Sequence, residues 1–211
     1  ALNAKGDPEA AVECCKQALK IEPDNADAYN NMGIALNDKG DSEAAVASYK
    51  QALNIKPDDA EVYNNMGVAL KDMGDPDASI DSYKQALKIK PNDAEVYNNM
   101  GVALKDKGDP EAAIISYKQA LKIKPDYAEV YYNMGAALKG KGSLGSAIDS
   151  YKKALKIKPD YFEAYNGMGN ALYAKGDLEA AIDSYKQAVN INPDHADAYY
   201  NRGHVLVEKG A

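Results

Sequence analysis

The stretch AEVYNNMGVALKDKGDPEAAIISYKQALKIKPDY, residues 94–127, decides the fold of this chain. Its pattern recurs with a period of 34 residues along the sequence of 211 residues. Proline, glycine and tyrosine each mark one position of the period, and each does so six times. The three sets are Pro23, Pro57, Pro91, Pro125, Pro159 and Pro193; Gly33, Gly67, Gly101, Gly135, Gly169 and Gly203; and Tyr29, Tyr63, Tyr97, Tyr131, Tyr165 and Tyr199. Self-similarity at a fixed period is the signature of a repeat architecture, in which one supersecondary unit stacks on the next.

Five complete units follow when the period is counted from Ala26. They are residues 26–59, 60–93, 94–127, 128–161 and 162–195, and partial units occupy residues 1–25 and 196–211. Because each unit of such an array buries its apolar face only against its neighbours, we predict a single domain over residues 1–211.

Each unit contains two helical stretches separated by a turn, which is Lys-Gly-Asp-Pro-Glu at residues 107–111. Gly108 is expected to end the first helix and Asp109 to cap the second. Pro110 then takes the first helical position, where its missing N–H costs nothing. All nine prolines fall at this position or in the turn between units, so none interrupts a helix.

Apolar residues recur at helical spacing in both stretches and predict the buried face of each helix. In residues 94–127 the inward positions are Val96, Tyr97, Met100, Gly101 and Leu104 in the first helix, and Ala113, Ile114, Tyr117, Ala120, Leu121 and Ile123 in the second. A glycine inside a helix costs about 1 kcal/mol relative to alanine. We therefore expect the paired helix to approach each glycine closely, with a tyrosine such as Tyr117 packed over the gap.

These positions resemble the signature of the tetratricopeptide repeat, over the whole chain. In the unit 94–127, the residues at the signature positions are Tyr97 in place of the usual Trp, the pair Met100 and Gly101, and then Leu104, Ala113, Tyr117, Ala120 and Pro125. The resemblance implies an all-α solenoid, a right-handed superhelix of antiparallel helix pairs. In that family the first helices line a concave groove that holds a partner.

The groove positions of this chain carry a column of asparagines. Positions 5 and 6 of successive units supply Asn30, Asn64, Asn98, Tyr132, Asn166 and Tyr200, and Asn31, Asn65, Asn99, Asn133, Gly167 and Asn201. The column resembles the asparagine ladder in the repeat arm of O-linked N-acetylglucosamine transferases, which grips the main chain of an extended peptide. A carboxamide offers a donor and an acceptor together, as a peptide group requires, and Gly167 interrupts the column. The alternative is that these asparagines bond backbone groups at helix junctions or face water.

The last units differ from the first three at the groove. They place Tyr132, Phe162, Asn170, Tyr173, Tyr200 and His204 at groove or groove-edge positions. Aromatic side chains supply much of the binding energy at interfaces, which favours these residues as the determinants of specificity. Ordinary drift at exposed positions is the competing explanation.

Position 2 of every unit is acidic, and the residues are Asp27, Glu61, Glu95, Glu129, Glu163 and Asp197. Compensation of the helix dipole in the first turn explains this row. The row also disfavours one client, because the co-chaperone type of tetratricopeptide domain clamps a C-terminal carboxylate with Lys and Arg at positions that here carry Asn and acids.

Composition excludes several other functions. A net charge of −7 argues against nucleic acid and anionic membrane as partners, and the sequence shows neither a leader nor an apolar run long enough to span a membrane. Cys14 and Cys15 are adjacent, which fits small buried side chains in a reducing compartment, by default the cytoplasm. The two histidines, His195 and His204, are isolated. We therefore predict no catalytic site, no metal and no cofactor.

The two partial units are complementary, since one lacks a first helix and the other lacks a second. We therefore predict head-to-tail self-association through residues 1–25 and 196–211, although Arg202, where other units carry Met, argues against it. For the chain as a whole, the sequence favours a scaffold that binds an extended peptide or a partner protein. The alternatives are a substrate-recruiting arm of a larger enzyme, such as a glycosyltransferase, and a self-associating structural array.

Overall fold

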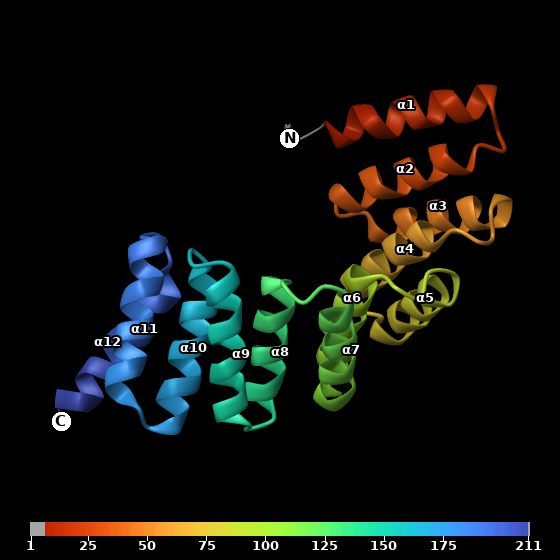
Figure 1. Cartoon of the computed structure of the whole chain (residues 1–211). Coiled ribbons are helices and arrows are strands. Elements are labelled where there is room, and N and C mark those ends of the chain that lie inside the picture. Colours follow the sequence, from red (N-terminus) through yellow and green to blue (C-terminus); the bar gives the residue numbers. More distant parts are fainter. Residues whose placement is uncertain (1–6, 211) are drawn as a thin grey trace. The chain divides into compact units, whose positions relative to one another are not determined.

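The computed structural model describes residues 7–210, which form twelve helices and no strand (Figure 1). The chain divides between Lys107 and Gly108 into two compact units. The first unit contains α1 (Pro8–Ile21), α2 (Ala26–Asp38), α3 (Ser42–Ile55), α4 (Ala60–Asp72), α5 (Pro76–Ile89) and α6 (Ala94–Asp106). The second contains α7 (Pro110–Ile123), α8 (Ala128–Gly140), α9 (Leu144–Ile157), α10 (Phe162–Lys175), α11 (Leu178–Ile191) and α12 (Ala196–Gly210).

Helices alternate between two roles with the predicted period. We call the even-numbered helices first helices and the odd-numbered helices second helices. Within each unit a first helix packs on the second helix that follows it, as α2 does on α3 and α10 does on α11. First helices also contact one another within each unit, α2 with α4 and α4 with α6, and α8 with α10 and α10 with α12. The prediction of an all-α array of helix pairs is therefore confirmed.

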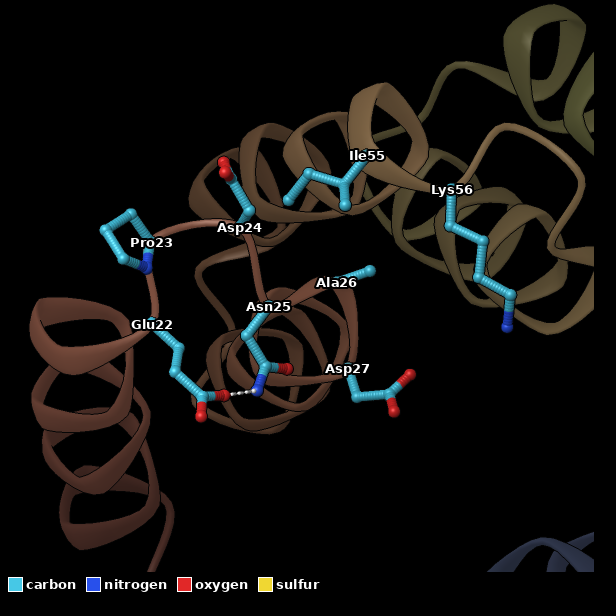
Figure 2. Close-up of a pocket in the computed structure, with 8 residues that line it drawn as sticks. All are labelled: Glu22, Pro23, Asp24, Asn25, Ala26, Asp27, Ile55 and Lys56. Carbon is cyan, nitrogen blue, oxygen red and sulfur yellow. Dashed lines mark hydrogen bonds between the residues drawn. The ribbon is translucent and has the colours of Figure 1, made fainter.

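Short polar side chains fix where the helices begin. Asn25 caps α2, because its Oδ1 accepts the N–H of Ala28 at 2.9 Å while its Nδ2 donates to Glu22 at 2.9 Å (Figure 2). Asp109 caps α7 by accepting the N–H of Ala112 at 2.9 Å, as predicted. Gly108, in the turn before it, has a φ of +90°, a conformation that residues with a Cβ rarely adopt.

The mid-helix glycines lie against tyrosine rings of the paired helix. A Cβ built on Gly33 would lie 2.5 Å from Cε1 of Tyr49, and one on Gly169 would lie 2.6 Å from Cε1 of Tyr185. Tyr49 is only 2% exposed. The loss of helix propensity is therefore offset by close packing of a large ring, which confirms the prediction for the glycines of α2, α4, α8 and α10.

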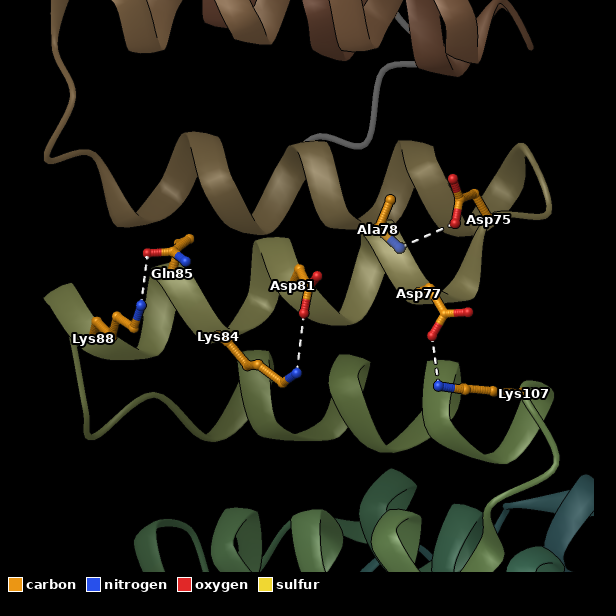
Figure 3. A network of polar contacts seen from close by, with 8 residues as sticks. All are labelled: Asp75, Asp77, Ala78, Asp81, Lys84, Gln85, Lys88 and Lys107. Carbon is orange, nitrogen blue, oxygen red and sulfur yellow. Dashed lines mark hydrogen bonds and ion pairs between the residues drawn. The ribbon is translucent and has the colours of Figure 1, made fainter.

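Ion pairs join the end of a first helix to the start of the second helix one repeat earlier. Lys107, directly after α6, contacts Asp77 in α5 (Figure 3). The same pair recurs as Lys39 with Glu9 at 3.1 Å, Lys141 with Glu111 at 2.8 Å and Lys209 with Glu179 at 3.0 Å. The chain departs from this pattern at Met73 and at Gly145, where one member is not charged.

Two predictions about burial are wrong. Ile123, assigned to the buried face, is 38% exposed because it is the last residue of α7 and no further turn covers it. Cys14 is exposed and Cys15 is half-buried. The cysteines lie on a second helix that has no preceding first helix among residues 7–210, so the face that is covered in other second helices is open.

Candidate functional site

Asparagines on consecutive first helices bond to one another across the repeats. In the first unit, Nδ2 of Asn65 donates to Oδ1 of Asn30 at 3.2 Å, and Nδ2 of Asn99 donates to Oδ1 of Asn64 at 3.2 Å. We call these four residues the amide row. Position 6 of one repeat thus bonds position 5 of the repeat before it. Neither sequence-based alternative anticipated this, because both considered each side chain alone.

The amide row keeps hydrogen-bonding capacity after these bonds are made. A carboxamide has two N–H donors and an oxygen that accepts twice, and each of these bonds uses one donor and one lone pair. Asn64 and Asn65 are half-buried and line a cavity of about 610 Å³ together with Glu61, Glu95 and Val96. The remaining donors and acceptors therefore lie where an extended chain has room to reach them.

The cations beside this cavity are already neutralised. Lys56 pairs with Asp59 at 2.7 Å, and Lys90 pairs with Asp93 at 2.7 Å. Burial opposes ionisation of Asp59, but hydrogen bonds from Lys56 and from the N–H of Val62 hold the pKa of its carboxyl below the usual value. These acids are also the N-caps of α4 and α6, so they position the first turns that carry the cavity wall.

Three further asparagines of the predicted column lie at the same register. Asn31 is exposed on α2, Asn98 is buried on α6 and Asn133 is half-buried on α8. In the second unit, Nδ2 of Asn201 donates to Oδ1 of Asn166 at 3.3 Å, so the pairing of the amide row recurs there.

At Gly167 an aromatic cluster replaces the amide pair. Both members are changed together, since the position that would accept its bond carries Tyr132. The ring of Tyr132 lies 6.0 Å from that of Tyr151 and 5.2 Å from that of Tyr161, between centroids. A Cβ on Gly167 would come within 2.9 Å of Tyr151. At this repeat, packing between tyrosine rings therefore replaces the hydrogen bond between two asparagines.

Four of the six predicted specificity residues of the last repeats, Asn170, Tyr173, Tyr200 and His204, meet at one cavity of about 350 Å³, which we call the α10–α12 pocket. Oδ1 of Asn170 accepts the hydroxyl of Tyr185 at 2.8 Å, and burial raises the pKa of that tyrosine to about 12. Phe162 lies elsewhere, with its ring 5.0 Å from that of His195 and against the core. The lining residues are Lys139, Asn170, Tyr173, Tyr185, Tyr200, Asn201, His204 and Val205.

Comparison with known proteins agrees with this fold. The sequence matches the TPR repeat family over residues 1–40, 35–74, 70–108, 103–142, 140–176 and 169–210. The chain belongs to the tetratricopeptide repeat (TPR) family.

Among solved structures, this TPR chain is similar to MamA, with 30% identity and a TM-score of 0.71 over 79% of this chain and 97% of the other. It shares the fold of YrrB, at 22% identity and a TM-score of 0.70 over 92% and 100% of the two chains. It also shares the fold of pilF from Pseudomonas aeruginosa, at 20% identity and a TM-score of 0.73 over 88% of each chain. No curated protein sequence matches it significantly.

Residues 7–210 bring together no group of three or more His, Cys, Asp or Glu side chains that could hold a metal ion. None of the described helices is long and apolar enough to cross a membrane.

Sequence reasoning missed Lys139 as a lining residue of the α10–α12 pocket. A signal for it exists, since Lys71 and Lys105 at the same repeat position are each followed by Asp, whereas Lys139 is followed by Gly140.

Proposed function

We propose that this TPR chain is a binding scaffold that holds an extended segment of a partner protein against its first helices, without catalysing a reaction. The amide row carries the proposal. Its asparagines are aligned by bonds between repeats and keep unused donors and acceptors, and two of them, Asn64 and Asn65, border a cavity of about 610 Å³. Fixing side chains before a ligand arrives lowers the entropy cost of binding.

The spacing of the row suits a peptide main chain. Helices pack about 8–10 Å apart and a strand rises about 3.3 Å per residue, so each repeat spans roughly three residues of an extended segment. YrrB, which shares the fold, is described as a TPR protein with an unusual peptide-binding site. In the second unit the bonded pair of Asn166 and Asn201 would serve the same purpose.

The test is a screen of random peptides against the unaltered chain and against Asn65→Ala with Asn99→Ala. Loss of the two amides should weaken binding by about 1–3 kcal/mol in total. The matched control is Gln51→Ala with Gln187→Ala, which removes two exposed amides from second helices. Equal affinity of all three proteins would show that the amide row serves only to join the repeats. Recruitment to an adjoining enzyme domain would use the same row and give the same result for this chain.

A second candidate function is self-association of the 211-residue chain, and the exposed faces of α1 and α12 favour it. A Cβ on Gly203 would meet nothing within 4 Å, whereas its equivalents lie against tyrosine rings. Val207 is 75% exposed, and Ala18 is exposed where its equivalent Ala52 is buried. Among residues 7–210, α1 thus has no first helix before it and α12 has no second helix after it.

Sedimentation analysis over a range of concentrations tests this second candidate. The weight-average mass should rise with concentration, and Val207→Glu should lower that rise by placing a charge in the joint. Lys186→Glu, on the exposed face of α11, is the control. A mass that stays at one chain throughout the range would remove the idea.

A further inference from the structure

The hydrogen bonds inside the α10–α12 pocket leave one amide presenting only donors. Oδ1 of Asn170 accepts the Tyr185 hydroxyl at 2.8 Å and Nδ2 of Asn201 at 3.2 Å, which occupies both of its lone pairs. Asn201 is held in turn by its bond to Asn166. The two N–H groups of Asn170 are therefore the part of this side chain that remains for a ligand.

The same pocket is lined by a lysine without its usual neighbour. Lys71 pairs with Asp72 at 3.1 Å, and Lys105 pairs with Asp106 at 3.4 Å. Lys139, at the same repeat position, is half-buried, is followed by Gly140, and forms no ion pair with any residue that the structure describes. A partly buried cation without a counter-charge favours an anion more than an exposed one does, because water screens it less.

Aromatic rings form the walls. The rings of Tyr173 and His204 meet edge to face with centroids 5.6 Å apart. The hydroxyl of Tyr173 donates to Glu208 at 2.7 Å, which holds the ring. Val205 is buried at the floor, and Tyr200 is exposed at the rim. A ligand here therefore meets apolar surface around a small group of donors.

We propose that the α10–α12 pocket receives the carboxylate of an Asp or Glu side chain from within the extended partner segment, an inference that rests on the proposed scaffold function. Lys139 supplies the charge and the N–H groups of Asn170 supply directed hydrogen bonds. The aliphatic stem of the acidic residue packs on Tyr173 and His204. An internal side chain fits an extended segment that continues along the first helices, whereas a chain end would have to stop there.

Peptides with blocked ends test this directly. Each peptide is acetylated at its N-terminus and amidated at its C-terminus, so that its one Glu is the sole carboxylate, and the matched peptide carries Gln instead. The Glu peptide should bind the unaltered chain about fivefold more tightly, and added salt should reduce that ratio. Lys139→Gln and Asn170→Ala should each bring the ratio close to one. Lys186→Gln, an exposed lysine outside the pocket, should leave the ratio unchanged.

The outcomes separate this inference from the function on which it rests. Equal binding of the Glu and Gln peptides, or a ratio that survives Lys139→Gln, would overturn the carboxylate site while the scaffold function stands. Failure of every peptide to bind would overturn both. Tighter binding of a peptide whose only carboxylate is its free C-terminus would overturn the internal site in favour of recognition of a chain end. Thermal melting of each variant confirms that a lost preference does not reflect unfolding.

Discussion

Tyr83 lies directly over Gly67, so that a Cβ on the glycine would come within 2.5 Å of Cε1 of the ring. Tyr83 is fully buried, and its ring fills the contact between α4 and α5. The relationship between the two residues recurs in α2, α8 and α10, and explains why these first helices carry a residue of low helix propensity at their centre.

Gly67→Ala should therefore destabilise the protein although alanine is the better helix former. Forcing a methyl group into a packed contact costs about 1–3 kcal/mol. The gain in helix propensity from glycine to alanine is only about 1 kcal/mol, so the loss should dominate. Urea unfolding should show a lower midpoint for this variant. Gly203→Ala is the control, because nothing lies within 4 Å of its Cβ. That variant should be neutral or more stable, and a similar loss in both would contradict the role assigned to Tyr83.

The amide pair of Asn30 and Asn65 should contribute measurably to stability. A double-mutant cycle with Asn30→Ala and Asn65→Ala isolates the energy of their bond at 3.2 Å. We expect a coupling of about 0.5–1.5 kcal/mol in the free energy of unfolding. The pair Asn30 and Asn99, which shares no bond, is the control and should be additive. Additivity in both cycles would mean that the amide row adds nothing to the stability of the array.

The sequence predicted most of the fold because its information is local and repeated. The turn at Gly108 and the cap at Asp109 follow from backbone preferences of single residues, and the structure has both. The bonds between asparagines were not predicted, because they depend on the register between helices that are 34 residues apart. Lys139 was missed for a related reason. It differs from Lys71 and Lys105 only because the next residue is Gly140 and not an aspartate.

Gly145→Glu should stabilise the second unit. Gly145 lies in the first turn of α9 with open space around it, and the equivalent position carries an acid where the ion pair between repeats is present. The substitution restores helix propensity, places a negative charge at a helix N-terminus and supplies a partner for Lys175. The expected gain is about 1 kcal/mol in the free energy of unfolding. Gly145→Gln separates the contributions, because it recovers the propensity without the charge, and its gain should be smaller and independent of salt.

Stability should fall in acid partly through the caps at Asp59 and Asp93. Both carboxyls have a pKa below the usual value in the folded protein, where burial is outweighed by hydrogen bonds from lysine and backbone N–H groups. A depressed folded pKa gives stability that is present above the unfolded pKa, near 4, and is lost as pH falls through the folded value. Asp59→Asn keeps a capping side chain but removes this charge.

The Asp59→Asn variant should therefore be less stable than the unaltered chain at pH 7 by about 0.5 kcal/mol. The difference should shrink as pH falls below 4, because the unaltered carboxyl then becomes neutral as well. Asp58→Asn, at the neighbouring loop residue, removes a charge that neither caps a helix nor pairs with a described residue, and it serves as the control. Urea unfolding at a series of pH values measures both variants. A difference for Asp59→Asn that stays constant from pH 7 to pH 2 would show that its charge does not stabilise the fold.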